Sequence, residues 1–329
     1  MIYFIGDVYL DKKYSVDIKL QNFIFNLEYP ICQAQNPAKN KINLFQKKSF
    51  IKETFNDQNP LAVCLSNNHI MDYGNKGFNQ TISFLDKEQI KYFGAGNKNN
   101  NYNNPCIIDL NQKKIAILGY CCHSTNPIFG NDDTNGAAPL DIDLIIKDVN
   151  KSKIIADYII IQLHWGDEEI KYPKYSDISK ARSLIDSGAD LIIGHHAHRI
   201  QTHEIYKKKS IYYGIGNFIF PNLNVPSYYN GRLFLKRYIK KQSESNKKSL
   251  LIKVDIDVKG EIVVDHDTVY FNGESVKIRK AFIPNWLPSN DKMYELYRRL
   301  YIKKIQIVNF AKRPRIPTFK NIKYFLFGD

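Results

Sequence analysis

The stretch YIIIQLHWGDE, residues Tyr158–Glu168, decides the fold class of this chain. Its first part is almost entirely apolar and rich in Ile, which indicates a strand that is buried on both faces. The stretch GADLIIGHHAH, residues Gly188–His198, repeats the arrangement, because a short apolar run is again followed at once by polar residues. Between the two, apolar residues recur at helical spacing from Ile178 to Leu184, and Gly188 is placed to end that helix. Strand, helix and strand in this order predict an α/β fold.

This pattern continues on both sides of the two stretches. Further runs that predict buried strands are Ile2–Ile5, Phe23–Phe25, Leu61–Leu65, Ile115–Leu118 and Ile211–Ile215. Another predicted helix carries Phe78, Ile82 and Leu85 on one face. After Asn217 the character changes, and the runs that alternate like antiparallel strands are Arg232–Tyr238, Leu250–Val258 and Glu261–Tyr270.

Composition bounds the class of protein. The 329 residues include 47 Lys and Arg against 33 Asp and Glu, so the formal net charge is +14 and anionic partners are favoured. No apolar run approaches the roughly 18 residues that a membrane-spanning helix needs. The five cysteines are odd in number and follow no CxxC spacing, which indicates reduced thiols. The opening residues MIYFIGDVYLD carry no basic region, which disfavours a secretory signal, so we expect a cytoplasmic protein.

Polar residues follow directly after most of the predicted strands. They are Asp7, Asn26, Glu28, Asn67, Asn68, His69, Asp72, His164, Glu168, His195, His196, His198 and Asn217. Because the carboxyl ends of strands in such a sheet lie at one edge, we expect these side chains to converge. Taken singly, each motif also fits a turn, a helix cap, a solvated strand end or a satisfied core histidine. Taken together, carboxylate, amide and imidazole donors without thiolate predict an open catalytic centre for Mn, Fe or Zn.

The motifs in their order along the chain carry a resemblance. They are GDVYL at Gly6–Leu10, NLEYP at Asn26–Pro30, LSNNHIMDYG at Leu65–Gly74, GAGN at Gly94–Asn97, HWGDE at His164–Glu168, GADLIIGHHAH at Gly188–His198 and YGIGNFIF at Tyr213–Phe220. Together they resemble the bacterial capsule-synthesis CapA family, or poly-γ-glutamate synthesis type, which is similar to the calcineurin-like metallophosphoesterases. The resemblance implies a metallophosphoesterase-like sandwich of two mixed β-sheets flanked by helices, over residues 1–275. Residues 276–329 would form a basic C-terminal extension.

The resemblance also implies a set of metal ligands. Residue by residue, these are Asp7, Glu28 as the bridging acid, Asn68, His164, His196 and His198. They would hold one or two divalent cations, which activate water and clamp the oxygens of a phosphoryl group. His69 would be the proton donor or oxyanion stabiliser, oriented by Asp72. Tyr9 stands where the wider superfamily has the His of an Asp-x-His pair, so one position is expected to be short of a ligand.

Two further expectations concern residues near these ligands. Candidates for contact with the substrate are Tyr9, Trp165, Glu168 and Asn217, for which packing and turn geometry are the alternative roles. In an extended loop, residues two apart share a side and the residue between them points away. We therefore expect His196 and His198 to coordinate and His195 not to.

The function predicted on this basis is that of a metal-dependent phosphoesterase, a hydrolase of capsule or surface polysaccharide biosynthesis. Its substrate would be a phosphorylated, anionic or lipid-linked glycan intermediate. The first alternative is a non-hydrolytic accessory subunit of a capsule or poly-γ-glutamate synthase, which the missing histidine would favour. The second is a nucleic-acid phosphodiesterase, which is disfavoured because no nucleic-acid-binding motif is present.

The basic C-terminal extension is a separate question. Tyr297, Leu300, Tyr301 and Ile305 fall at helical spacing among basic residues, and Pro314 and Pro317 would end this helix. The simpler interpretation is a helix packed on its own domain with solvated Lys and Arg. The alternative is peripheral contact with anionic membrane at the inner face of the cell membrane.

Overall fold

The computed structural model describes residues 1–33, 36–39, 41–99, 102–229, 232–285, 287 and 291–312. The chain divides into two units, Met1–Leu287 and Pro288–Asp329. Within the second unit, the predicted helix is present as α5 (Asp291–Lys312). Pro314 and Pro317, which were predicted to end it, lie outside the described residues, as do the basic residues that follow Lys312. No helix in the described part of either unit is both long and apolar enough to cross a membrane.

A mixed sheet built on the first strand of the chain forms one layer of the first unit. Among the described residues it has nine strands, in the spatial order β2 (Ser15–Val16), β19 (Ser275–Ile278), β18 (Ile262–Phe271), β17 (Lys248–Ile256), β1 (Ile2–Val8), β3 (Phe23–Leu27), β4 (Ala62–Cys64) and β5 (Lys91–Phe93), with β14 (Asn217–Ile219) also paired to β1. Strands β1, β3, β4 and β5 are parallel to one another. Strand β17 is antiparallel to β1, and β18 is antiparallel to β17.

The second layer contains the two stretches that predicted the fold. Its six described strands, in spatial order, are β12 (His203–Tyr206), β13 (Lys209–Tyr212), β11 (Leu191–His195), β10 (Tyr158–His164), β8 (Lys113–Cys121) and β7 (Cys106–Leu110). The four central strands are parallel and the two edge strands are antiparallel. Two small ribbons complete the strands, namely β15 (Leu223–Tyr229) with β16 (Arg232–Lys240), and β6 (Ala95–Gly96) with β9 (Gly136–Ala137).

An apolar core lies between the two sheets. Phe4 and Ile24 of the nine-stranded sheet share it with Ile117, Ile160 and Ile193 of the six-stranded sheet, and all five side chains are fully buried. A second cluster covers the other face of the nine-stranded sheet. The central parallel strands of both layers are buried on both faces, which is why they are nearly continuous apolar runs.

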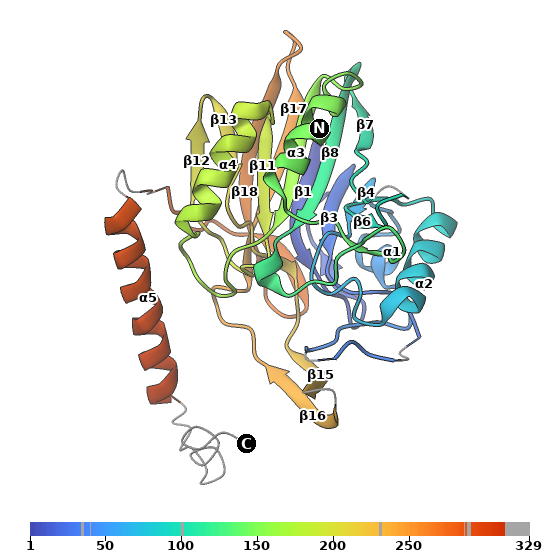
Figure 1. The fold of residues 1–329 in the computed structure, drawn as a ribbon, viewed down its shortest axis with the longest axis vertical. Coiled ribbons are helices and arrows are strands. Elements are labelled where there is room, and N and C mark those ends of the chain that lie inside the picture. Colours follow the sequence, from blue (N-terminus) through green and yellow to red (C-terminus); the bar gives the residue numbers. More distant parts are fainter. Residues whose placement is uncertain are drawn as a thin grey trace. The chain divides into compact units, whose positions relative to one another are not determined.

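Helices cover the outer faces of these layers (Figure 1). They are α1 (Ile51–Thr54), α2 (Gly74–Lys87), α3 (Ile142–Ser152) and α4 (Tyr175–Ser187), with a 3₁₀ turn at His123–Thr125. Helices α3 and α4 contact each other, and α4 packs on β11. Helix α4 ends at Gly188, whose φ of 114° is the left-handed conformation that glycine adopts most readily. The prediction of a sandwich of two mixed sheets flanked by helices is confirmed.

Two glycines let the strand ends approach closely at the edge where the polar residues gather. A Cβ atom on Gly194 would lie 1.9 Å from the carbonyl oxygen of Tyr213, and one on Gly6 would lie 1.9 Å from that of Gly216. Both distances are far below any van der Waals contact, so only glycine fits at these positions. Each glycine directly precedes a site residue, Asp7 or His195.

Some elements differ from the prediction. The run Ile211–Ile215 is a strand only up to Tyr212, because the chain then turns through residues 213–216 toward β14. Helix α3 was not predicted, although Asp141 caps it by accepting a hydrogen bond from the Leu144 N–H. Strands β5, β7 and β12 were missed because each is short and partly exposed.

Candidate metal centre

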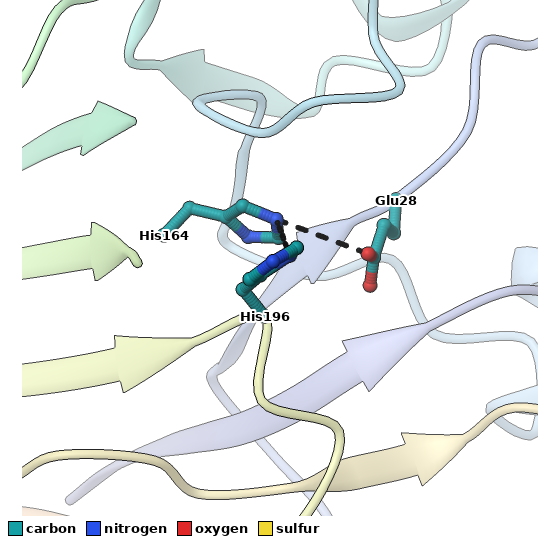
Figure 2. A group of neighbouring side chains, drawn as sticks. All are labelled: Glu28, His164 and His196. Carbon is teal, nitrogen blue, oxygen red and sulfur yellow. Dashed lines mark hydrogen bonds and ion pairs between the residues drawn. The ribbon is translucent and has the colours of Figure 1, made fainter. Parts of the chain in front are cut away.

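The predicted ligands meet at the carboxyl edge of both sheets. Asp7 lies near the end of β1, Glu28 follows β3, and Asn68 follows β4. From the other sheet, His164 ends β10, while His196 and His198 follow β11. Figure 2 shows Glu28 facing the rings of His164 and His196. Residues separated by up to 191 positions thus come together because parallel strands end at a common edge.

These residues form two overlapping groups of potential ligands. In one group, Asp7, Glu28 and His198 place one donor atom each within 4.8 Å of one another, and in the other group Glu28, His164 and His196 do the same. Asn68 joins the second group, since its Oδ1 lies 2.8 Å from Nε2 of His164. We call the first group position A and the second, with Asn68, position B. Glu28 belongs to both, as expected of a bridging acid.

At position A, the buried carboxylate of Asp7 is surrounded by protein donors. Its Oδ1 accepts a hydrogen bond from Asn26 Nδ2 at 2.9 Å and lies 2.8 Å from Nδ1 of His195. Its Oδ2 accepts from the His196 N–H at 3.3 Å and lies 3.3 Å from Nδ1 of His198. Burial raises the pKa of Asp7, but the hydrogen bonds and charges of His195 and His198 outweigh burial and hold the pKa well below its usual value.

Glu28 is in the opposite situation. Its side chain is 0% exposed, and neither carboxylate oxygen has a hydrogen-bond partner among the described residues. Burial raises its pKa well above the usual value, and the positive charge of His198 offsets this only in part. An ionised carboxylate buried without hydrogen bonds is costly, and a bound cation would reduce that cost. The donor set therefore fits divalent metal ions.

The pKa values of the three histidines also differ between the two positions. Burial, together with the charge of His196, holds the pKa of His164 well below its usual value. Burial is also the largest cause at His196, and it lowers that pKa to about 3. His198 differs, because Glu28 and Asp7 outweigh burial and raise its pKa to about 10. At neutral pH, position B thus offers neutral imidazoles, which is the form that binds metals.

Buried amides fix the orientation of these ligands. Asn67 donates to Asn26 at 3.0 Å, and Asn26 in turn donates to Asp7. Asn217 Oδ1 lies 2.8 Å from Nδ1 of His198, which leaves Nε2 of His198 directed to Glu28 at 3.5 Å. Such partners set the ring orientation and the tautomer of a ligand histidine.

His69 and Asp72 form the predicted pair beside the centre. Nδ1 of His69 lies 2.7 Å from Oδ2 of Asp72, and the Leu44 N–H donates to the same oxygen at 2.6 Å. The other oxygen of Asp72 lies 2.6 Å from Nζ of Lys41, which also donates to the carbonyl oxygen of Asn68. Asp72 is fully buried, so its orientation toward His69 is fixed from three sides.

The centre opens into a cavity of about 190 Å³. The cavity is lined by Lys41, Ile42, Leu44, Asn68, His69, Thr125, Asn126, Glu168, His198, Phe220, Leu223, Tyr238 and Lys240. His69 and His198 therefore face the same space as two lysine side chains. A molecule in this cavity would meet candidate metal ligands, the imidazole of His69 and positive charge together.

Of the four residues predicted to contact the substrate, Glu168 lines the cavity and three do not. Trp165 is buried, and its Nε1 donates to the Tyr213 carbonyl at 2.9 Å. Asn217 contacts His198 instead. The Tyr9 hydroxyl accepts a hydrogen bond from Gln46 at 2.8 Å. Its ring packs against other aromatic rings of the core.

The loop that carries the late histidines is not extended, and this part of the prediction is wrong. His196 has a φ of 82° and His198 a φ of 54°, so both adopt left-handed backbone conformations. Their rings reach the two groups through this kink and not through strand alternation. His195 belongs to neither group, and its Nδ1 contacts Asp7.

Sequence reasoning did not assign a role to several residues that shape the site. Asn26 and Asn67 lie inside motifs that were recognised, so a signal existed. Lys41 and Lys240 gave no signal, because lysines are frequent throughout the chain and these two reach the cavity only through the tertiary fold.

Comparisons with known proteins agree with the motifs. Capsule biosynthesis protein CapA of Bacillus anthracis is 28% identical over 224 residues, which cover 65% of this chain and 54% of that protein. PGA biosynthesis protein CapA of Bacillus subtilis (strain 168) is 32% identical over 198 residues, which cover 59% and 52%. The chain thus spans about half the length of the curated relatives it matches.

Two further comparisons concern a solved structure and a family model. A putative 5'-nucleotidase from Staphylococcus aureus matches with a TM-score of 0.42 and 12% identity, over 73% of this chain and 42% of that one, too remote to carry an argument. The family model described as bacterial capsule synthesis protein PGA_cap matches residues 16–222, more than half of the chain. This chain therefore belongs to the PGA_cap family of bacterial capsule synthesis proteins.

Proposed function

We propose that this protein is a metal-dependent phosphoesterase of capsule or surface-polymer biosynthesis. The observation that carries the proposal is Glu28, a fully buried carboxylate that belongs to both groups of potential ligands and has no hydrogen-bond partner in the described part of the chain. Membership of the capsule synthesis family supports the biosynthetic context. The proposed substrate is a phosphorylated or otherwise anionic glycan intermediate.

The residues of the two positions are those that would hold the metal. Asp7, Glu28 and His198 would hold a cation at position A, and Glu28, Asn68, His164 and His196 would hold one at position B. Oxygen and imidazole donors without thiolate suit Mn, Fe or Zn. When bound, these ions act as Lewis acids toward the phosphoryl oxygens and promote ionisation of water.

The remaining chemistry belongs to His69. Asp72 binds its Nδ1, so Nε2 is the nitrogen that can carry a proton toward the cavity. As water adds to phosphorus and the bond from phosphorus to the leaving oxygen breaks, His69 Nε2 gives its proton to that oxygen. Lys41 holds the second oxygen of Asp72 and keeps the carboxylate in place.

Charge at the cavity supports an anionic substrate. Lys41 and Lys240 both line it, although each already contacts a carboxylate. A phosphoryl or carboxylate group on the substrate would meet positive charge on entry. Nucleic acid is a weaker candidate, because the sequence contains no nucleic-acid-binding motif.

The decisive experiment measures metal content and phosphatase activity together. The purified protein, loaded with Mn²⁺ and assayed on p-nitrophenyl phosphate and bis-p-nitrophenyl phosphate, should hydrolyse at least one of them. His69→Asn should lower kcat about 10² to 10⁴-fold without lowering metal content. His266→Gln, a histidine on β18 outside the centre, is the control and should behave like the wild type.

Two outcomes would overturn the proposal. A protein that binds no divalent metal would have no such centre, and one that binds metal but cleaves neither ester would not be a general phosphoesterase. Either result would favour the alternative role, a non-hydrolytic accessory subunit of a polymer synthase.

We further propose a cytoplasmic location with peripheral membrane contact through α5. This helix exposes Met293, Leu296, Leu300 and Ile307 at helical spacing. Its exposed basic residues are Lys292, Arg299, Lys303 and Lys304, against Asp291 and Glu295, whereas Arg298 is buried. Apolar side chains beside clustered positive charge are typical of helices that lie on anionic membrane.

Sedimentation with liposomes tests this contact. The wild type should sediment with vesicles containing phosphatidylserine at low salt, and Lys303→Glu with Lys304→Glu should weaken binding by about 1 kcal/mol or more per lysine. Lys147→Glu with Lys151→Glu on α3 is a matched control on another helix. Equal sedimentation of all three proteins would contradict membrane contact through α5.

A further inference from the structure

Glu168 makes a third group of potential ligands at the mouth of the centre. It lies four residues beyond the end of β10, and its carboxylate lies within 4.8 Å of one nitrogen each of His196 and His198. His198 belongs to position A and His196 to position B. Glu168 therefore lies near one ligand of each position, and it lines the cavity.

Position A has fewer donors than position B. It contains Asp7, Glu28 and His198, whereas position B has Asn68 as a fourth donor. The residue two positions after Asp7 is Tyr9, whose hydroxyl is engaged by Gln46 and whose ring belongs to the apolar core. Tyr9 thus does not reach into the space that the ligands share with the cavity.

The Glu168 carboxylate is paired with Lys240. Its Nζ lies 3.3 Å from Oε2 of Glu168 and 2.9 Å from Oε1 of Glu169. The Lys240 side chain is only 16% exposed, whereas that of Glu168 is 47% exposed. A mostly buried ammonium group thus stands beside a carboxylate that the two histidines also approach. The ammonium supplies the positive charge that a metal ion would otherwise supply there.

We propose that Glu168 is an additional metal ligand that compensates for Tyr9 at position A, and that Lys240 is its counter-ion in the metal-free protein. The inference rests on the proposed metal centre. It implies that cation and ammonium compete for one carboxylate. A carboxylate that coordinates directly also adds a negative charge that an imidazole at the same place would not add.

Paired substitutions in adjacent residues test this assignment. Glu168→Gln keeps the size of the side chain but removes the anionic ligand, whereas Glu169→Gln weakens the contact to the same lysine outside every ligand group. Titration calorimetry with Mn²⁺ and metal analysis after dialysis should show at least about 10-fold weaker binding at one of two sites in Glu168→Gln. Glu169→Gln should bind like the wild type. Equal metal affinity and content in Glu168→Gln and the wild type would overturn the proposal.

A second variant tests the competition. Lys240→Met removes the counter-ion, so Mn²⁺ should bind several-fold more tightly, and this gain should disappear when Glu168→Gln is also present. Unchanged affinity in Lys240→Met would overturn the role of Lys240 and would indicate a lysine that serves the substrate. If the wild type itself binds no Mn²⁺, the proposed function fails. Full binding by Glu168→Gln would leave that function intact and refute only the present assignment.

Discussion

The two halves of the candidate centre are built on different principles, although they share Glu28. At position A the acid Asp7 is surrounded by protein groups, which are Asn26, His195 and His198. At position B the histidines approach each other, with Nδ1 of His196 3.1 Å from Nε2 of His164, and no acid other than Glu28 belongs to the group. At position A the charge of Asp7 thus has charged and amide partners in the protein, whereas the contacts of the position B histidines are to each other and to the amide of Asn68.

This difference indicates which position contributes more to the free energy of unfolding of the protein. Asp7 with protonated His198 is a buried ion pair, and removing one partner of such a pair leaves an uncompensated buried charge. Burial disfavours the charged forms of His164 and His196, so these two histidines form no such pair. Loss of a partner at position A should therefore cost more stability than loss of one at position B.

The largest expected effect comes from the residue that both halves share. Glu28→Gln should abolish binding of both cations and lower phosphatase activity about 10³-fold or more, because a neutral amide cannot replace the bridging charge. Metal analysis and the phosphatase assay check the two parts of this prediction. Bound metal at the wild-type level in the variant would contradict the bridging role of Glu28.

The next prediction separates the halves. Asp7→Asn should destabilise the metal-free protein by about 3–5 kcal/mol, because it leaves His195 and His198 without their buried anion. His164→Gln should lower the stability of the protein in EDTA much less, and its main effect should be weaker binding of metal. Urea unfolding with and without Mn²⁺ measures both. Similar losses of stability in EDTA for the two variants would contradict the proposed difference between the positions.

The dependence of stability on pH should also divide between the positions. The raised pKa of His198, about 10, contributes stability that is complete below the usual value of 6.5 and is lost as the pH rises toward 10. The lowered pKa of His196, about 3, acts in the opposite direction, since stability is complete above 6.5 and falls as the pH drops toward 3. His198→Gln should therefore flatten the alkaline side of the profile, and His196→Gln the acid side. Unfolding free energies in EDTA from pH 4 to 10 test this, and a reversed assignment would refute it.

The smallest effect concerns Tyr9. Tyr9→Phe removes only the hydroxyl that accepts from Gln46, so we expect a loss of about 1 kcal/mol and unchanged metal content. Thermal unfolding and metal analysis are sufficient. Loss of one bound cation would instead make the tyrosine a ligand at position A.

The sequence predicted the candidate ligands of this centre better than the residues around them. Polar residues at the ends of apolar runs were expected to converge, because the strand ends of a parallel sheet share an edge. The metal roles of Asp7, Glu28 and the histidines stay predictions. The kink at His196 and His198 was missed, since histidine rarely adopts positive φ and nothing in the local sequence requires it.

The lysines show a different limit. Lys41 lies in a loop rich in Lys and Asn, and Lys240 ends a strand of a ribbon, so neither stands out from the bias of the whole chain. Their importance comes from contacts across long sequence separations, with Asp72 and with Glu168. Only the fold brings these pairs together. The local sequence pattern therefore identified the candidate ligands at the strand ends, but it did not identify the two lysines that pair with acidic residues of the site.

If both positions bind cations as proposed, the carboxylate that they share couples the two binding events. The first cation would have to ionise and orient Glu28, and the second would find that carboxylate already ionised but beside a positive charge. The affinity of one position therefore depends on whether the other is filled, and linkage requires the dependence to be equal in both directions. A metal titration of this protein should consequently deviate from two independent isotherms, and the sign of the deviation will tell whether ionising Glu28 or repulsion between the cations dominates.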